Sequence, residues 1–292
     1  MGKLIADAML PLLRVHGAVR MKLVENPERF QIGVLERLLE AVSSAVGFVV
    51  PQSYSEGLIA HVRDEGQDYK HHSTRGHQTR SALAFHSDRC DVNLLLYVRA
   101  ARSGGELSVV SYQDAANHLR ELDEQSLATL FDGFPFDLRN ERIFPSLEWH
   151  WRPILWKHCG DIRGHYIRRF VIDSQRHADC PRLTRRQVHA LDRFDEILEG
   201  MRQTRSFTPR PGELLVMDNY RVMHARTAYD DFEDSQGGRL ALRTWVAPYD
   251  SEPLPLTLHP LAGTCTAGSY RGGVGRGEGF LLNLGKTSTT FD

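Results

Sequence analysis

The sequence lacks an excess of charge of either sign. It contains 36 lysines and arginines against 37 aspartates and glutamates, which gives a formal net charge of -1. Such a balance provides no overall attraction to nucleic acid, so no nucleic-acid partner is expected. The composition favours a small molecule as the partner.

Cysteines are also few, and none of them are paired in sequence. Cys90, Cys159, Cys180 and Cys265 lie far apart and form no CxxC motif. This pattern indicates neither a zinc ribbon nor a disulfide framework. We therefore expect reduced thiols and a cytoplasmic location.

Long hydrophobic runs are missing from the chain as well. No segment approaches the roughly 18 apolar residues of a membrane span, and the apolar N-terminal stretch is broken by Asp7 and Pro11. Ala6 stands where a myristoylation signal starting at Gly2 would need Ser or Thr. The sequence predicts a soluble protein with no membrane partner. No long heptad repeat indicates an oligomeric state.

The chain does contain enough apolar sequence for one substantial core. Its 292 residues are 41% hydrophobic, which is typical of a single all-β or mixed domain. We expect one domain over residues 1–292, with an N-terminal extension at 1–25 and a glycine-rich C-terminal tail at 260–292. The segment 273–279 superficially resembles a nucleotide-binding loop, but no predicted strand and helix flank it, which favours a mobile tail.

Hydrophobic periodicity predicts both helices and strands. Helices are expected at 26–47 and 112–131, and a third from the capping box at Thr184 to Gly200. The strands predicted from apolar runs include 92–98, 107–111, 165–172 and 239–246. The aromatic segment 134–158 fits either a satellite core or a substrate lid.

A histidine and an aspartate stand at the end of the apolar run 81–88. If this run is a strand, alternate side chains share a face, so His86 and Asp88 point the same way. They supply two corners of the two-histidine, one-carboxylate arrangement that holds non-haem Fe(II). His224, which follows another predicted strand, supplies the third.

Spacing alone does not identify this site. His177 and Asp179 have the same spacing, but they lie in a polar segment broken by proline, where no strand would hold both side chains on one face. Taken singly, each histidine of the proposed site could equally be a satisfied core residue, and the aspartate a turn residue. Their strand context, together with Arg243 downstream, favours the metal site.

Four further histidines lie in the polar segment 51–80. They are His61, His71, His72 and His77. A polar loop more often displays histidines than binds metal with them, so no ligands are expected here. His77 is the strongest candidate of the four, because it lies nearest to the motif.

Several motifs carry a resemblance to a known family. They are LAFHSDRCDV (83–92), SGG (103–105), PGELLVMDNYRVMHARTAY (211–229) and RLALR (239–243). Over roughly residues 45–250 the chain resembles the taurine dioxygenase family of Fe(II)/2-oxoglutarate-dependent oxygenases, which is related to γ-butyrobetaine hydroxylase and clavaminate synthase. The resemblance implies a mainly β fold with flanking helices, namely a double-stranded β-helix of the jelly-roll, cupin-like kind.

The resemblance also implies roles for individual residues. His86, Asp88 and His224 match the iron ligands of the family. Arg243 matches the arginine that grips the C5 carboxylate of 2-oxoglutarate, and Arg239 matches a second basic position. The implied cofactors are Fe(II), the cosubstrate 2-oxoglutarate and O2.

One position departs from the family pattern, and another argues against a related chemistry. Leu107 stands where the family often has a Thr or Ser that bonds 2-oxoglutarate, and Ser108 is predicted on the opposite face. Either a register shift lets Ser108 serve, or another donor does. Asp88 is retained where halogenases of the superfamily have a small residue, which disfavours halogenation.

The implied reaction is hydroxylation of an unactivated C–H bond in a small polar metabolite, such as an amino acid or a natural-product intermediate, with release of succinate and CO2. Gln78, Arg89 and Arg226 are candidate substrate contacts, and the basic residues near the motifs favour a substrate with a carboxylate. Desaturation or cyclisation by the same chemistry is an alternative. A protein hydroxylase and a non-catalytic cupin-like binding protein are two others.

Overall fold

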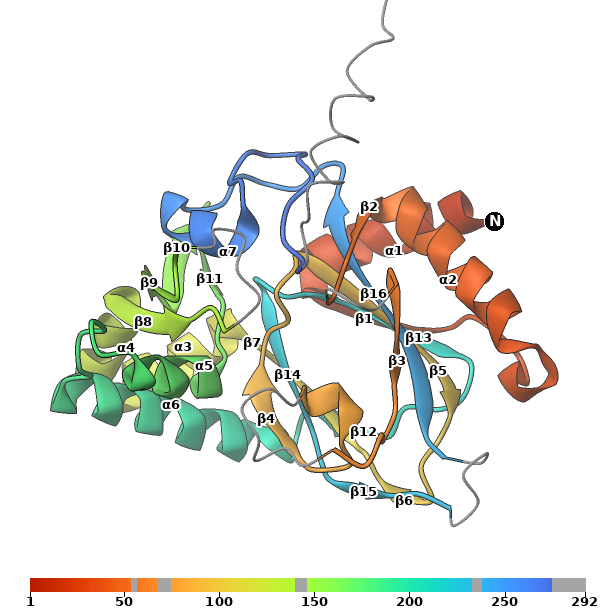
Figure 1. Cartoon of the computed structure of the whole chain (residues 1–292), viewed down its shortest axis with the longest axis horizontal. Helices are drawn as coiled ribbons and strands as arrows, with labels where there is room; N and C mark the ends of the chain where they lie inside the picture. The colour runs from red at the N-terminus through yellow and green to blue at the C-terminus, as the bar shows by residue number, and fades with distance from the viewer. Residues whose placement is uncertain (54–56, 68–74, 140–145, 233–237, 275–292) are drawn as a thin grey trace, which may run out of the picture.

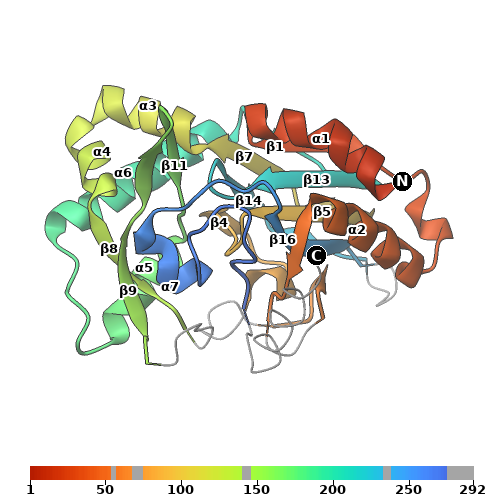
Figure 2. The same cartoon turned by 90° about the horizontal axis from the view of Figure 1, so that it is seen from above.

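Two β-sheets lie at the centre of the molecule, between two groups of helices. The computed structural model describes residues 1–53, 57–67, 75–139, 146–232 and 238–274. Helices α1 and α2 cover one side of the sheets, and α3 to α6 lie at the opposite side (Figures 1 and 2).

The larger sheet has the order β1-β13-β5-β16-β2, with β3 also paired to β16. Its strands are Ala18–Lys22 (β1), Glu213–Asp218 (β13), Val92–Arg99 (β5), Leu240–Pro248 (β16), Gly47–Val50 (β2) and Ile59–Val62 (β3). The smaller sheet has the order β12-β7-β14-β4 and consists of Ser206–Phe207, Leu107–Ser111, Val222–Arg226 and Leu83–His86. β6 (Ser103–Gly104) pairs with β15 (Tyr229–Asp230) at the edge.

The strand ladders of both sheets are antiparallel. A buried apolar cluster joins the sheets, because Leu95 and Leu215 of the larger sheet pack with Leu107 and Val222 of the smaller one. This is the double-stranded β-helix, and the expected fold class is confirmed.

Alternation along the strands decides which residues face the interior. On β5, Leu94 and Leu96 pack with the helical layer, while Leu95 and Tyr97 face the other sheet. On β16, Leu242 packs outward and Arg243 lines the internal pocket. Burying one leucine contributes on the order of 2 kcal/mol, so the outward leucines fix the register that turns Arg243 inward.

The outer face of the larger sheet is covered by α1 (Gly2–His16) and α2 (Ile32–Val46). The expected N-terminal extension therefore contains a packed helix and the edge strand β1. The predicted helix 26–47 begins later than expected, because Pro27–Arg29 forms a separate 3-10 turn (η1) and Asn26 has a left-handed φ of 48°.

The second helical group packs around a different apolar cluster. It contains α3 (Tyr112–Leu122), α4 (Glu124–Phe131), α5 (Arg168–Asp173) and α6 (Arg185–Arg202), with the 3-10 turn η3 (Ser174–Arg176) after α5 and the strands β8 (Gly133–Asp137), β9 (Trp149–Pro153), β10 (Leu155–His158) and β11 (Asp161–Gly164). The capping box at Thr184 is present as predicted. The helix predicted at 112–131 is split in two, because Asp123 ends α3 and caps α4 through Ser126.

Most of the described aromatic residues between α4 and α5 are buried in apolar clusters. Phe134 and Phe136 belong to the cluster under α4 and α6, and Trp156 packs on Tyr220. Of the described residues in the predicted segment 134–158, Arg139 alone lines the pocket between the sheets.

The strand predicted at 165–172 is wrong. Ile167 makes a single bridge to His86, and the chain then turns into helix α5. Arg168 pairs with Asp192 and Asp195 of α6, so contacts between helices override the local alternation.

The C-terminal segment packs against the sheets as far as it is described. After the 3-10 turn Leu256–Leu258 (η4) and the short helix α7 (His259–Ala262), the side chain of Arg271 forms a buried ion pair with Asp91. Residues 260–274 therefore differ from the expected tail. Of the glycine-rich segment 273–279, residues 275–279 lie outside the described residues, as do 280–292.

Two chemical properties of the chain follow from the described residues. All four cysteines have free thiols. Among these residues, no helix is both long enough and apolar enough to cross a membrane.

Candidate metal centre

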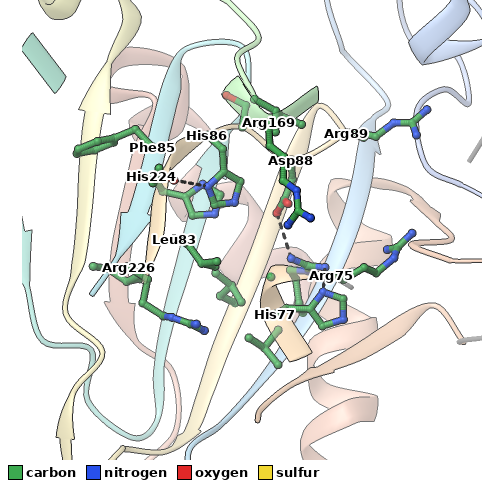
Figure 3. Close-up of a pocket in the computed structure, with 18 of the residues that line it drawn as sticks. Arg75, His77, Leu83, Phe85, His86, Asp88, Arg89, Arg169, His224 and Arg226 are labelled. Carbon is green, nitrogen blue, oxygen red and sulfur yellow. Dashed lines mark hydrogen bonds and ion pairs between the residues drawn. The ribbon is translucent and has the colours of Figure 1, made fainter. Parts of the chain in front are cut away.

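Three potential metal ligands meet between the strands β4 and β14. His86 ends β4, Asp88 follows two residues later, and His224 lies on β14 directly opposite His86 in the ladder. Their ligand atoms all lie within 4.8 Å of one another. The two imidazole rings lie side by side, with centroids 4.3 Å apart (Figure 3).

The two histidines are held as neutral imidazoles. His86 Nδ1 lies 2.8 Å from the carbonyl oxygen of Ala84, so Nδ1–H donates this bond and Nε2 keeps its lone pair. Burial lowers the pKa of His86. It also lowers the pKa of His224 to about 3, with a further contribution from His86. The Nδ1 atom of His224 is buried without a hydrogen-bond partner.

The carboxylate of Asp88 is oriented through one of its oxygens. Oδ2 accepts a bond of 2.7 Å from Asn93 Nδ2 and one of 3.4 Å from Arg243 Nη1. Burial alone would raise the pKa of Asp88, but the charge of Arg243, with the hydrogen bond from Asn93, outweighs burial and holds this pKa below its usual range. Oδ1 is left available as an anionic ligand atom.

The backbone of Asp88 is also fixed on both sides. Its N–H donates to Asn219 Oδ1 at 3.0 Å, and His165 Nε2 lies 3.2 Å from its carbonyl oxygen. Nδ1 of His165 accepts a 2.7 Å bond from Arg152, whose guanidinium stacks on Phe136 at 3.4 Å. The sequence does not predict that His165 and Arg152 support the backbone of Asp88. The one sequence feature that indicates such a role is the polar run around Arg152 within an aromatic segment.

This donor set fits Fe(II). Two neutral imidazoles and one carboxylate on one face of the site are the ligands that leave open positions on a non-haem iron. Nδ1 of His224 is buried without a partner, so protein contacts alone do not satisfy the hydrogen-bonding capacity of the polar atoms at this site.

The pocket beside the three ligands lies between the two sheets and contains Arg243 and Arg239, which share the inward face around β16. Arg243 is 7% exposed and makes three contacts: Nε to Gln52 Oε1 at 2.6 Å, Nη1 to Asp88, and Nη2 to His77 Nδ1 at 3.4 Å. All three nitrogens of its guanidinium group are therefore engaged.

Arg239 and Arg226 form a second basic group in the pocket. Each is at least 96% buried, and Nη1 of Arg239 and Nε of Arg226 have no hydrogen-bond partner. The backbone carbonyls of Thr79 and Ser81 accept from Arg226, each at 2.7 Å. Burial and the neighbouring Arg239 lower the pKa of Arg226 to about 10. Two guanidinium groups are thus held together where an anion would stabilise both.

The candidate substrate contacts separate into two groups. Arg89 and Arg226 line the pocket. Gln78 differs from the expectation, because its side chain completes the capping box of a 3-10 turn (η2, Gly76–Gln78) and donates to Glu65 at 3.1 Å. Its neighbour His77 lines the pocket instead.

His77 is not a member of the metal-ligand group in the described part of the chain. Burial, followed by the nearby Arg243, lowers its pKa to about 2, so it is a neutral partner of that arginine. Of the other loop histidines, His61 contacts Glu36 at 2.7 Å, while His71 and His72 lie outside the described residues. The closeness of His77 to the motif in sequence therefore indicated a residue of the pocket, but not a metal ligand.

The structure also shows which side chain faces the pocket at the position that departs from the family pattern. Leu107 lines the pocket. Ser108 points away from it and bonds Ser206 Oγ at 2.6 Å. No register shift brings Ser108 to the pocket, so another donor must take the place of the family hydroxyl.

Comparison with known proteins agrees with this geometry. The family "Taurine catabolism dioxygenase TauD, TfdA family" matches residues 3–245. FR-33289 synthase of Streptomyces rubellomurinus is 27% identical over 260 residues, which cover 88% of this chain and 76% of that protein. The taurine hydroxylase-like protein SAT17 of Stachybotrys chartarum is 28% identical over 158 residues, which are 53% of this chain and 40% of that protein.

Solved structures share the fold. Asparagine oxygenase (AsnO) has a TM-score of 0.62 and 17% identity, over 84% of this chain and 78% of its own. The non-haem iron oxygenase OrfP, in complex with Fe, succinate and (3S)-hydroxy-L-arginine, has a TM-score of 0.61 and 17% identity, over 83% of this chain and 79% of its own.

The match to the family spans most of the chain, and the sheets supply its two-histidine, one-carboxylate group. The cofactors of this class of enzyme are Fe(II), 2-oxoglutarate and O2. The chain belongs to the TauD/TfdA dioxygenase family and is an Fe(II)/2-oxoglutarate-dependent oxygenase.

Proposed function

We propose that the chain hydroxylates an unactivated C–H bond of a small polar metabolite, such as an amino acid or a natural-product intermediate, and converts 2-oxoglutarate to succinate and CO2. The observation that carries this proposal is the convergence of His86, Asp88 and His224 beside the buried arginines of one pocket. The compounds named with two solved relatives, hydroxyasparagine and hydroxyarginine, support a substrate of amino-acid size.

In this proposal His86, Asp88 and His224 hold the iron, and Asn93 and Arg243 keep one oxygen of Asp88 turned toward it. When bound, the iron supplies the site at which O2 is reduced while 2-oxoglutarate loses CO2. The other residues position the reactants. The two histidines stay neutral because of burial, and this keeps their lone pairs available to a metal.

The arginines of the inward face bind the cosubstrate. The resemblance matches Arg243 to the C5 carboxylate, but its nitrogens already contact Gln52, Asp88 and His77. Arg239 and Arg226 have donors without partners, so they offer the better site for a carboxylate. We assign the distal carboxylate of 2-oxoglutarate to Arg239 and Arg226, and its metal-proximal end to the neighbourhood of Arg243.

A small substrate is favoured over a partner protein because the reactive face lies in a pocket between the sheets, where most of the lining residues near the three ligands are buried. The free thiols support a reducing compartment such as the cytoplasm.

The experiment is a screen for Fe(II)-dependent succinate release from 2-oxoglutarate over amino acids and related metabolites. Turnover that requires both Fe(II) and 2-oxoglutarate, and a product heavier by one oxygen, would support hydroxylation. A product lighter by two hydrogens would instead assign desaturation or cyclisation. Succinate release that is equal in wild type and in Asp88→Ala would contradict the proposal.

A further inference from the structure

The position of Leu107 shows where a replacement for the family hydroxyl has to lie. Leu107 on β7 stands directly opposite Arg226 on β14 in the ladder, so the two side chains leave the sheet on the same face. Both of them line the pocket. A hydroxyl at position 107 would therefore lie beside Arg226, which is proposed to bind the distal carboxylate of 2-oxoglutarate together with Arg239. The replacement donor has to reach the same place from another strand.

Tyr97 reaches this place from the facing sheet. It lies on β5, lines the pocket and belongs to the same buried cluster as Leu107. The guanidinium carbon of Arg239 lies 5.6 Å from the centre of the Tyr97 ring. The phenol group is therefore next to Arg239, on the wall of the pocket that faces Leu107.

A second tyrosine, Tyr229, holds the two guanidinium groups close together. The guanidinium carbons of Arg226 and Arg239 lie 4.8 Å and 5.2 Å from the centre of the Tyr229 ring. After burial, the charge of Arg239 is the largest cause that lowers the pKa of Arg226, as expected for neighbouring guanidinium groups. Tyr229 is not among the residues that line the pocket, so its ring supports the two arginines from outside.

The polar atoms of this group lack partners. Four of them are buried without a hydrogen-bond partner, namely the hydroxyls of Tyr97 and Tyr229, Nη1 of Arg239 and Nε of Arg226. Buried polar atoms of folded proteins nearly always have a partner, so four of them in contacting residues indicate a group that binds there. Because phenol and guanidinium groups can all donate, the group that satisfies them is an anionic acceptor.

The hydroxyl of Tyr97 is suited to donate to such an anion. Burial raises the pKa of Tyr97 to about 12, although the charge of Arg239 offsets part of this effect. The hydroxyl therefore keeps its proton at neutral pH. Figure 3 shows Arg226 on the opposite side of the histidine pair from Arg89, so an anion bound by this group lies apart from the outer turn after β4.

We propose that Tyr97 replaces the family hydroxyl and donates a hydrogen bond to the distal carboxylate of 2-oxoglutarate, beside Arg239 and Arg226. This inference rests on the proposed function, and it adds a residue that selects the cosubstrate. Two guanidinium groups and a phenol match the several lone pairs of a carboxylate. A 2-oxo acid that ends in a methyl group would leave the same donors unpaired, so the site selects against it.

The test compares wild-type protein with Tyr97→Phe, which keeps the ring and removes only the hydroxyl. Each protein is loaded anaerobically with Fe(II) and titrated by calorimetry with 2-oxoglutarate and with 2-oxopentanoate, which has the same chain length but no distal carboxylate. We expect Tyr97→Phe to bind 2-oxoglutarate about tenfold more weakly, because it loses a hydrogen bond to a charged group. Its affinities for 2-oxopentanoate and for Fe(II) should stay within about twofold of wild type. Equal 2-oxoglutarate affinity in the two proteins, or an equal loss for both acids, would overturn the proposal.

A restored hydroxyl tests the replacement itself. Combining Tyr97→Phe with Leu107→Thr returns a hydroxyl to the place beside Arg226, and we expect this double variant to recover most of the lost 2-oxoglutarate affinity. A phenol that only packs in the core would not be replaced by a hydroxyl on the facing strand. Absence of any recovery would therefore contradict the proposal.

Two other tyrosines complete the comparison. Tyr229→Phe should weaken 2-oxoglutarate less than Tyr97→Phe does, because Tyr229 does not line the pocket. Tyr249→Phe is the matched control, because Tyr249 is exposed and its hydroxyl donates to the carbonyl oxygen of Ser44 at 3.2 Å. A larger loss in Tyr229→Phe than in Tyr97→Phe would assign the donor to Tyr229 and overturn the proposal.

The proposed function and the role of Tyr97 fail in different experiments. If wild-type protein loaded with Fe(II) binds no 2-oxoglutarate, the proposed function is wrong, and the role of Tyr97 with it. If wild-type protein binds 2-oxoglutarate and Tyr97→Phe binds it equally well, only the role of Tyr97 is wrong.

Discussion

The chain contains two His-x-Asp segments of identical spacing, and the fold uses them differently. His86 is the last residue of β4 and Asp88 follows two residues later, and both lie close to His224 on the neighbouring strand. His177 follows a 3-10 turn, where it contacts Asp137 at 3.3 Å and Glu148 at 2.9 Å, and Asp179 is exposed. A third ligand across a strand ladder, rather than spacing, distinguishes a metal site from an ion-pair network.

The largest expected effect comes from removing a metal ligand from one of the two segments. We expect His224→Ala or Asp88→Ala to lower Fe(II) affinity and turnover by more than about 100-fold, beyond the loss typical of residues that only support a ligand. His177→Ala should stay within about twofold of wild type. Equilibrium dialysis with Fe(II) and succinate assays measure both, and equal losses in the two segments would contradict the assignment.

The second prediction separates the two arginines near β16. Arg239→Gln should weaken 2-oxoglutarate binding about 100-fold, because it removes a buried partner of the distal carboxylate. Arg243→Gln should have the smaller effect on 2-oxoglutarate and the larger effect on Fe(II), because Arg243 contacts Asp88. Titrations with 2-oxoglutarate and with Fe(II) measure both effects. If Arg243→Gln weakened 2-oxoglutarate binding more than Arg239→Gln did, Arg243 would instead be the partner of the C5 carboxylate.

The third prediction concerns the groups that hold Asp88. Asn93→Ala removes the 2.7 Å bond to Oδ2 and should lower Fe(II) affinity about 10- to 100-fold with the fold intact. Asn117→Ala, whose side chain contacts only residues of its own helix in the described structure, is the matched control. An unchanged Fe(II) affinity in Asn93→Ala would show that Asp88 needs no such support.

The fourth prediction is a pH dependence of the stability of the metal-free protein. Burial, followed by Arg152, lowers the pKa of both His150 and His165. Below a pH of about 6.5 the unfolded chain therefore binds protons that the folded chain does not, and the free energy of unfolding falls as the pH is lowered.

Each such histidine contributes up to about 1.4 kcal/mol per pH unit in that range. Urea unfolding between neutral and mildly acidic pH measures the slope. His150→Leu should make the slope shallower by about one proton. A slope unchanged by His150→Leu would show that this histidine takes up a proton in the folded state.

The smallest expected effect concerns Gln78 and His77. Gln78→Ala should leave turnover within about twofold, because its side chain bonds Glu65 outside the pocket. His77→Ala should lower 2-oxoglutarate affinity several-fold through loss of its contact with Arg243. Steady-state kinetics with varied 2-oxoglutarate compare the two neighbours.

Much of the fold was predictable because its strands alternate strongly or are continuously apolar. The strands β5 and β7 and the capping box of α6 lie where the sequence predicts them. The pairing of His86 with His224 could be expected only through the family motifs, since ladder register depends on packing far along the chain.

The remaining features depend on tertiary contacts that no local pattern records. Helix α5 replaces a predicted strand because Arg168 pairs with α6. His165 supports Asp88 across 77 positions of sequence, and Arg271 ties a glycine-rich segment to Asp91. The arginines of the pocket come from many segments, so their concentration around one site appears only in the folded chain.

The most direct test of the central claim is the visible charge-transfer band that forms when Fe(II) and 2-oxoglutarate bind together without oxygen. We expect the weak band in wild type and in His177→Ala, and its loss in His224→Ala. Absence of the band in wild type, or its persistence in His224→Ala, would contradict the assignment of His86, Asp88 and His224 as the iron site.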